Sequence, residues 1–191
     1  TRYSHSEKDV YSISSDAVYS ITEDRYRRIW IGTLGGGLNL VNEKKDGSRT
    51  FINCSNLLRH SPDNLLYIHG MDVCKDKSVL VVGTDKGLYT CDLSLRPEKM
   101  RFYRNVRRNK DASSIGANNI TDVVCAADGQ IYVTTCGGGI SKILSDNLLS
   151  DSIRFRSFTS REGLATDVYL TLAVDGRQHI WGVGKFALTE I

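Results

Sequence analysis

The sequence predicts an all-β fold, and two observations support this class. First, residues 29–38 read Ile-Trp-Ile-Gly-Thr-Leu-Gly-Gly-Gly-Leu, a short apolar strand that ends in a glycine turn. The pattern recurs from Leu80, Ile131 and Ile180, so the copies begin 51, 51 and 49 residues apart. Second, no helical hydrophobic period lies between the copies. A repeat of about fifty residues that contains only strands is typical of β-propeller blades, whereas solenoid repeats contain helices.

Each repeat predicts a four-stranded antiparallel blade whose strands follow one another along the chain. An inner strand leads into a turn that contains an aspartate, namely Asp24, Asp128 or Asp175. Aspartate favours hairpin turns, so these residues are expected to shape turns rather than to act as acid catalysts. The recurring apolar strand, the glycine turn and a third strand come next. An outer strand that opens with an aromatic residue, such as Phe102, completes the blade.

The repeat divides the chain into one outer strand, three complete blades and one incomplete blade, sixteen strands in all. The predicted ranges are 1–14 for the outer strand and crossover loop of a preceding blade, 15–56, 64–105 and 117–160 for the complete blades, and 166–191 for the incomplete one. The chain is therefore expected to be a segment of a larger propeller.

One aromatic position recurs in the apolar strand that precedes the glycine turn. Trp30, Tyr132 and Trp181 occupy it in three of the four copies. An aromatic residue that reads a ligand need not recur in every blade, whereas one that fills the space between blades does. These three residues are therefore predicted to pack between blades.

Composition and motifs argue against a catalytic, metal or cofactor site and against nucleic-acid binding. The net charge is only +3, and the one dense basic run, residues 104–110, is expected to be a solvated loop. No apolar stretch approaches the roughly 18 residues that span a bilayer. The sequence contains no HExxH, GxSxG or phosphate-binding loop, and its four histidines are scattered without metal-ligand spacing.

The five cysteines form no CxxC pair and suggest no zinc site. Cys74 and Cys125 each lie six residues before the apolar strand of their repeat, so they occupy matching places in neighbouring blades. Such places are expected to be too far apart for a disulfide, whose Cα atoms must approach within about 7 Å. The cysteines are therefore predicted to be small apolar residues of the strands.

A binding site is more plausible than a catalytic one. In blade geometry, the loop that enters the inner strand and the glycine turn emerge on the same face. Amides, carboxylates and aromatic rings gather there, and these groups suit sugar hydroxyls and the C–H face of a sugar ring. The candidate ligand-binding residues are Asp16, Tyr19, Asn64, Asn118, Asn119, Asp167 and Tyr169. Alternatively, the Asp and Asn residues cap turns and the tyrosines pack between blades.

Two segments closely resemble the two-component regulator propeller repeat. They are residues 12–38, SISSDAVYSITEDRYRRIWIGTLGGGL, and residues 114–140, SIGANNITDVVCAADGQIYVTTCGGGI. The family pattern is a Ser-Leu-Ser-like loop, Val, Ile, an acidic turn, Trp-Ile-Gly-Thr and Gly-Gly-Leu. The second copy departs from it at Val81, which replaces the tryptophan, and its glycine turn is one residue shorter. The fourth copy has Gly184 for the threonine and Ala187 for the last glycine.

The resemblance implies seven-bladed propellers in the extracytoplasmic sensor half of hybrid two-component regulators, as found in Bacteroides-type bacteria. Such sensors tend to respond to oligosaccharides and pass the signal to a histidine kinase. The expected function is therefore a non-catalytic, periplasmic sensor segment that binds an oligosaccharide within a homodimeric parent protein and contacts no nucleic acid. A purely structural or dimerisation module, or less plausibly a propeller enzyme such as a glycan lyase, is the alternative.

Overall fold

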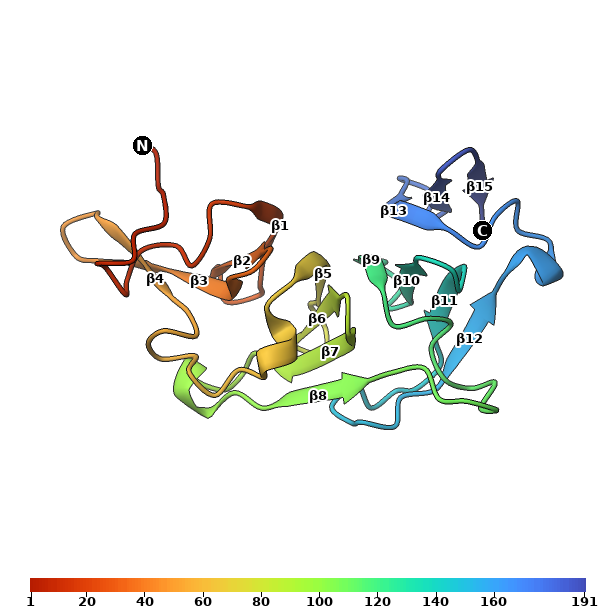
Figure 1. The fold of residues 1–191 in the computed structure, drawn as a ribbon, viewed down its shortest axis with the longest axis horizontal. Coiled ribbons are helices and arrows are strands. Elements are labelled where there is room, and N and C mark those ends of the chain that lie inside the picture. The colour runs from red at the N-terminus through yellow and green to blue at the C-terminus, as the bar shows by residue number, and fades with distance from the viewer.

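The computed structural model describes residues 1–191 and contains fifteen β-strands in four antiparallel sheets (Figure 1). The first sheet consists of β1 (Val18–Glu23), β2 (Ile29–Thr33), β3 (Gly37–Glu43) and β4 (Arg49–Ile52). The second consists of β5 (Ile68–Cys74), β6 (Val79–Thr84), β7 (Gly87–Asp92) and β8 (Phe102–Asn105). The third consists of β9 (Ile120–Cys125), β10 (Ile131–Thr135), β11 (Ile140–Ile143) and β12 (Phe155–Phe158). The fourth consists of β13 (Tyr169–Val174), β14 (Ile180–Gly184) and β15 (Leu188–Glu190).

The sheets stand side by side in an arc, as sectors of a propeller (Figure 1). The first strand of each sheet, β1, β5, β9 or β13, lies toward the centre of the arc, and β4, β8 and β12 lie at the periphery. Within each sheet the strands pair in chain order, as hairpin connections require. The predicted all-β fold of four-stranded propeller blades is confirmed.

Helical structure is confined to the connections between strands. It consists of three short 3-10 helices, η1 (Asp63–Leu65), η2 (Pro97–Lys99) and η3 (Ser160–Glu162). None of these has the length or the apolar character of a membrane-spanning helix.

The apolar core lies between neighbouring blades rather than inside any one of them. Trp30 is completely buried in the largest cluster, where it meets Ile68, Leu80 and other residues of the second blade. A second cluster fills the space between the second and third blades, and Tyr132 packs against a third one between the last two. Trp30 and Tyr132 therefore pack between blades as predicted. Trp181 belongs to none of these clusters.

The outer strand predicted within residues 1–14 is wrong, because residues 1–17 form no strand. An outer strand forms only by pairing with a third strand. The strands β3, β7 and β11 are already paired with β4, β8 and β12, and residues 1–17 do not pair with the free edge of β15. The segment instead lies against the first blade. The ring of Tyr3 meets that of Phe51 edge-to-face at 5.4 Å, and the Phe51 N–H donates to the Tyr11 carbonyl oxygen at 2.8 Å. Ile13 then joins Ile31 and Phe51 in a small apolar cluster.

Candidate binding site at the centre of the arc

Each inner strand carries a β-bulge at its second residue. In β1, Val18 pairs with Thr33 and Ser20 pairs with Gly32, which leaves Tyr19 without a partner. The same irregularity occurs in β5, β9 and β13. The bulged residues are Tyr19, His69, Thr121 and Leu170. A bulge bends its strand and re-aims the extra side chain, and bulges are frequent next to functional sites.

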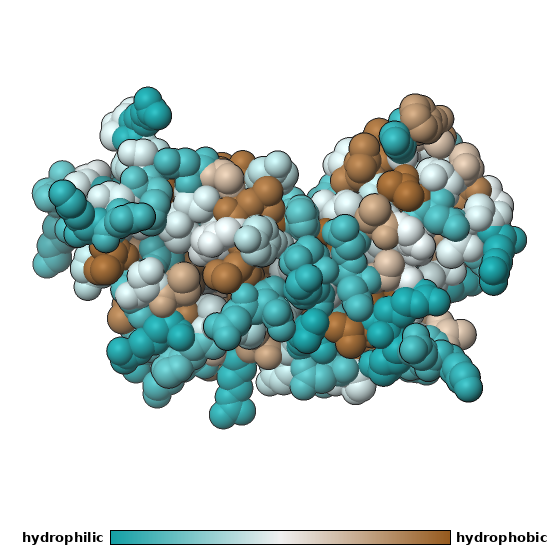
Figure 2. All heavy atoms as spheres, viewed as in Figure 1, coloured by the Kyte–Doolittle hydropathy of each residue, from teal (hydrophilic) through white to brown (hydrophobic).

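The four bulged side chains converge on one hollow of about 380 Å³ at the centre of the arc. Figure 2 shows the molecule hollowed between the first and the fourth blades. The lining residues are Tyr19, His69, Thr121, Asp122, Leu170 and Thr171. Every blade contributes at least one of them, so the hollow depends on the arrangement of all four sheets.

The first and second blades supply an aromatic wall. The ring of Tyr19 is 60% exposed and meets the ring of His69 edge-to-face, with 6.4 Å between centroids and 83° between planes. The Nε2 atom of His69 is buried and has no hydrogen-bond partner. The surface that this wall offers to a ligand is therefore the exposed ring of Tyr19.

The third and fourth blades supply a polar wall with fixed side chains. The Asp122 carboxylate accepts hydrogen bonds from the Thr171 hydroxyl at 2.6 Å and from the Leu172 N–H at 2.9 Å. The Thr121 hydroxyl donates to the Tyr169 carbonyl oxygen at 2.7 Å. These bonds join the two blades and hold the side chains in place before any ligand arrives, which lowers the entropic cost of binding.

Of the two predicted tyrosines, only Tyr19 lies in the hollow. Tyr169 is fully buried, and its hydroxyl meets the Thr189 hydroxyl at 2.7 Å. In the register of the inner strands Tyr169 corresponds to Val18, so the residue equivalent to Tyr19 is Leu170. Tyr169 is therefore a packing residue, as the alternative interpretation expected.

The predicted polar residues lie in the crossover loops, outside the hollow. Three of them accept a backbone N–H from earlier in the chain: Asp16 from His5, Asn118 from Arg107 and Asp167 from Ser160, at 2.6–2.7 Å. They cap their own loops. Asn64, within η1, and Asn119, which precedes β9, keep exposed side chains. The structure therefore does not bring these five residues together with Tyr19.

Sequence reasoning missed the other five lining residues, which are His69, Thr121, Asp122, Leu170 and Thr171. Thr121 and Leu170 lie ten residues before Ile131 and Ile180, the same spacing that separates Tyr19 from Ile29. The bulged residues have no side-chain type in common. The spacing of ten residues is therefore the one signal in the sequence that marks the bulged residue in these three blades.

The rim above the hollow is built from main-chain groups that join one blade to the next. The N–H groups of Gly35 and Gly37 both donate to the Leu66 carbonyl oxygen, at 2.9 and 3.0 Å. In the third blade, those of Gly137 and Gly139 donate to the Asp167 carbonyl oxygen, both at 2.9 Å. The glycine turn of each of these two blades therefore holds the crossover loop of the blade that follows.

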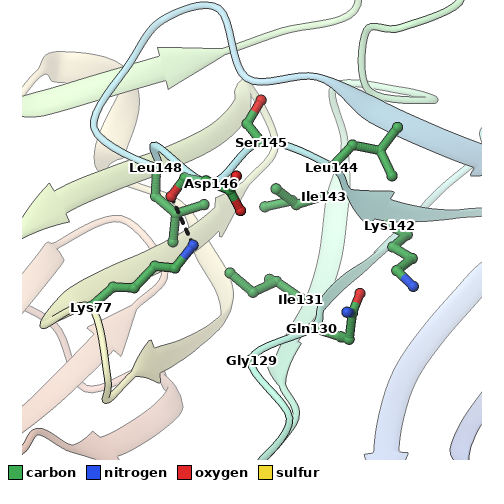
Figure 3. A pocket seen from close by; sticks show the side chains of 10 residues that line it. All are labelled: Lys77, Gly129, Gln130, Ile131, Lys142, Ile143, Leu144, Ser145, Asp146 and Leu148. Atoms are coloured by element: carbon green, nitrogen blue, oxygen red, sulfur yellow. Dashed lines mark hydrogen bonds between the residues drawn. The ribbon is translucent and has the colours of Figure 1, made fainter.

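A second hollow, of about 320 Å³, lies between the second and third blades (Figure 3). The Lys77 ammonium group reaches across it and donates to the Asp146 carbonyl oxygen at 2.7 Å. The lining has no aromatic ring, and the structure contains no cluster of His, Cys, Asp or Glu suited to a metal ion. The central hollow is therefore the better candidate for a binding site.

Comparison with known proteins identifies the repeat. The model of the two component regulator propeller family matches residues 12–35. These residues are thus similar to a two component regulator propeller repeat. The match covers the loop into β1, both strands of the first hairpin and the start of the glycine turn. No curated relative matches the sequence.

Solved structures that contain similar propellers share the fold at low sequence identity. The extracellular domain of a proposed hybrid two component system from B. thetaiotaomicron aligns over 95% of this chain and 24% of its own length, with 18% identity and a TM-score of 0.68. That of a proposed one component system from the same species aligns over 100% and 26%, with 17% identity and a TM-score of 0.71. A virginiamycin B lyase from Staphylococcus aureus aligns over 92% and 52%, with 14% identity and a TM-score of 0.59. The chain thus spans about a quarter of the two extracellular domains.

Proposed function

We propose that this chain is a non-catalytic segment of an extracytoplasmic sensor and that its central hollow binds an oligosaccharide. The observation that carries the proposal is the convergence of one bulged side chain from every blade on one hollow. An exposed tyrosine ring provides a stacking surface for a sugar ring. The threonine hydroxyls and the Asp122 carboxylate provide partners for sugar hydroxyls.

The sensor role rests on the propeller repeat at residues 12–35 and on the likeness to extracellular domains of two component systems. In the parent protein, binding would favour one arrangement of a homodimer and so change the activity of a histidine kinase. A ligand shifts such an equilibrium only by its difference in affinity for the two arrangements. Because all four blades line the hollow, a different spacing of the blades in the two arrangements would give the ligand a different affinity for each.

Titration calorimetry with a panel of neutral and acidic oligosaccharides tests the proposal. At least one of them is expected to bind, and Tyr19→Ala is expected to weaken that binding tenfold or more, which corresponds to about 1.4 kcal/mol. Tyr11→Ala is the matched control, because Tyr11 is also exposed but lies in the N-terminal segment. Absence of heat with every oligosaccharide would count against binding and favour a structural module. Cleavage of a bound oligosaccharide would favour an enzyme.

A further inference from the structure

Two cysteines from neighbouring blades lie beside each other, contrary to the expectation that their matching positions are too distant. Cys74 ends β5 and belongs to the apolar cluster between the second and third blades, and Cys125 ends β9 and packs against that cluster. Inner strands converge toward the centre of the arc, so matching residues approach each other there. The Cys125 N–H donates to the Asp72 carboxylate at 2.8 Å, which holds β9 against β5 at this point.

The two thiols are neighbours and line one hollow, where Cys125 is partly exposed and Cys74 is buried. The neighbouring Cys125 thiol lowers the pKa of the Cys74 thiol to about 7, although burial acts in the opposite direction. A lowered pKa favours the thiolate of Cys74, and the thiolate is the nucleophilic form. Both residues line a hollow of about 490 Å³, which gives a reagent access to them.

The other three cysteines lack this combination of a neighbouring thiol and a hollow. Cys91 is completely buried, and burial raises the pKa of its thiol far above the usual range. Cys136 is exposed and Cys54 is half-buried, and neither has a thiol partner. The chemistry of the pair is therefore specific to the contact between the second and third blades.

We propose that Cys74 and Cys125 are a redox-active pair that forms a disulfide between the second and third blades by exchange with a small-molecule disulfide. The Cys74 thiolate attacks one sulfur of the small disulfide, which breaks its S–S bond and releases one thiolate. Cys125 then loses its proton and attacks the Cys74 sulfur of the mixed disulfide, which releases the second thiolate. The two protein thiols are oxidised, and the small disulfide is reduced to two thiols. This inference does not depend on the proposed sugar site.

The test uses the full chain with Cys54→Ser and Cys136→Ser, which removes the accessible unpaired thiols. The protein is incubated with oxidised glutathione or with dithiothreitol, digested with trypsin without reduction and analysed by mass spectrometry. With oxidised glutathione, peptides 60–75 and 111–142, which then hold Cys74 and Cys125 as their only cysteines, are expected to be recovered as one linked species. The oxidised protein is also expected to melt about 10 °C higher than the reduced protein, because the bond closes a long loop.

Three outcomes would overturn the inference. They are recovery of both peptides with free thiols, retention of glutathione on Cys74 without a link to Cys125, and a link to the Cys91 peptide instead. A further Cys125→Ser change provides an independent check that does not need the link to form. In that variant Cys74 is expected to stop at the mixed disulfide, and a Cys74 that takes up no glutathione would contradict its assignment as the attacking thiol.

Discussion

One aspartate fixes the turn between β1 and β2 and holds the tryptophan of the repeat. The Asp24 carboxylate is buried and accepts hydrogen bonds from the indole N–H of Trp30 at 2.9 Å and from the Arg28 side chain at 2.6 Å. It also accepts the backbone N–H groups of Tyr26 and Arg28. Asp175 and Trp181 repeat the pair at 3.2 Å. Charge-assisted bonds of this kind are the stronger class of hydrogen bond.

The sequence predicts these aspartates as turn residues but does not predict the indole contact. In the third blade the position that matches Asp24 is Ala126, whose N–H donates to the Gln130 carbonyl oxygen as the Asp24 N–H does to that of Arg28. Asp128 lies two residues later, so its predicted equivalence with Asp24 is wrong. The aspartate occurs in the two blades that have tryptophan and is absent where Tyr132 has no indole N–H to offer.

Replacing Asp24 with alanine is expected to lower the free energy of unfolding by about 2–3 kcal/mol at pH 7, because several buried N–H groups lose their acceptor. Urea denaturation followed by circular dichroism measures the change. Asp46→Ala is the control, since Asp46 caps an exposed turn through Ser48, and its denaturation midpoint should remain close to that of the native protein. Equal losses in the two variants would contradict the role given to Asp24.

The same carboxylate predicts a pH dependence. Burial alone would raise the pKa of Asp24, but the hydrogen bonds from Trp30 and Arg28 and the Arg28 charge outweigh burial and lower it. A lowered folded-state pKa stabilises the fold above the unfolded value, near 3.8, and this contribution is lost as the pH falls through the folded-state pKa. The stability difference between the native protein and Asp24→Asn should therefore shrink between pH 5 and pH 2, as measured by urea titration. A stability difference that stays constant over this pH range would contradict a lowered pKa of Asp24 in the folded protein.

The glycine turns require glycine for two separate reasons. Gly137 and Gly139 both have a left-handed backbone, with φ of 98° and 69°. A Cβ atom at Gly137 would meet open space, whereas one at Gly139 would meet the carbonyl oxygen of Phe158 in the outer strand. Beside each turn, a buried threonine hydroxyl donates to the carbonyl oxygen of the closing glycine, at Thr33, Thr84 and Thr135.

Gly139→Ala is therefore expected to destabilise the protein more than Gly137→Ala. The Gly137 variant carries only the left-handed backbone cost of about 1–2 kcal/mol, and the Gly139 variant adds a steric clash of roughly the same size. Thermal unfolding of the two variants in parallel measures the difference, and the Gly137 variant is the control for backbone strain. Equal melting temperatures would show that the outer strand moves aside without cost.

The strands could be predicted from the sequence, but the candidate site could be predicted only in part. Strand period, aspartate turns and glycine turns are local patterns, and four copies of them define four blades. The bulges arise from the pairing of one strand with the next, so the sequence does not reveal that Thr121 rather than Ile120 is the unpaired residue. For the same reason Tyr169 resembles Tyr19 in type while its side chain lies in the core.

The arc leaves an apolar surface at its C-terminal end. Phe186 is 91% exposed and Leu188 is 66% exposed, and β15 has no neighbour on its outer side. Figure 2 shows brown, apolar residues gathered over the fourth blade. An unpaired strand edge beside exposed apolar side chains promotes association between chains.

The purified chain is therefore expected to self-associate as its concentration rises. Leu188→Lys should reduce the associated fraction severalfold in sedimentation velocity, because a charge on an edge strand opposes pairing. Leu57→Lys is the matched control, since Leu57 is exposed in a loop far along the chain from β15. A protein that stays monomeric at all concentrations would contradict the prediction that chains associate through the edge of β15.

The main-chain rim of the central hollow also constrains how such a protein can diversify. Gly37 and Gly139 hold the next blade through their N–H groups in a left-handed backbone conformation, so a side chain there disturbs the architecture before it alters recognition. Of the four bulged residues, only Thr121 makes such a bond to the next blade, and the four already differ as widely as tyrosine, histidine, threonine and leucine. Selection for a new ligand would therefore act on four scattered codons, each one residue inside an inner strand, while the glycine motifs that make the repeats recognisable stay unchanged.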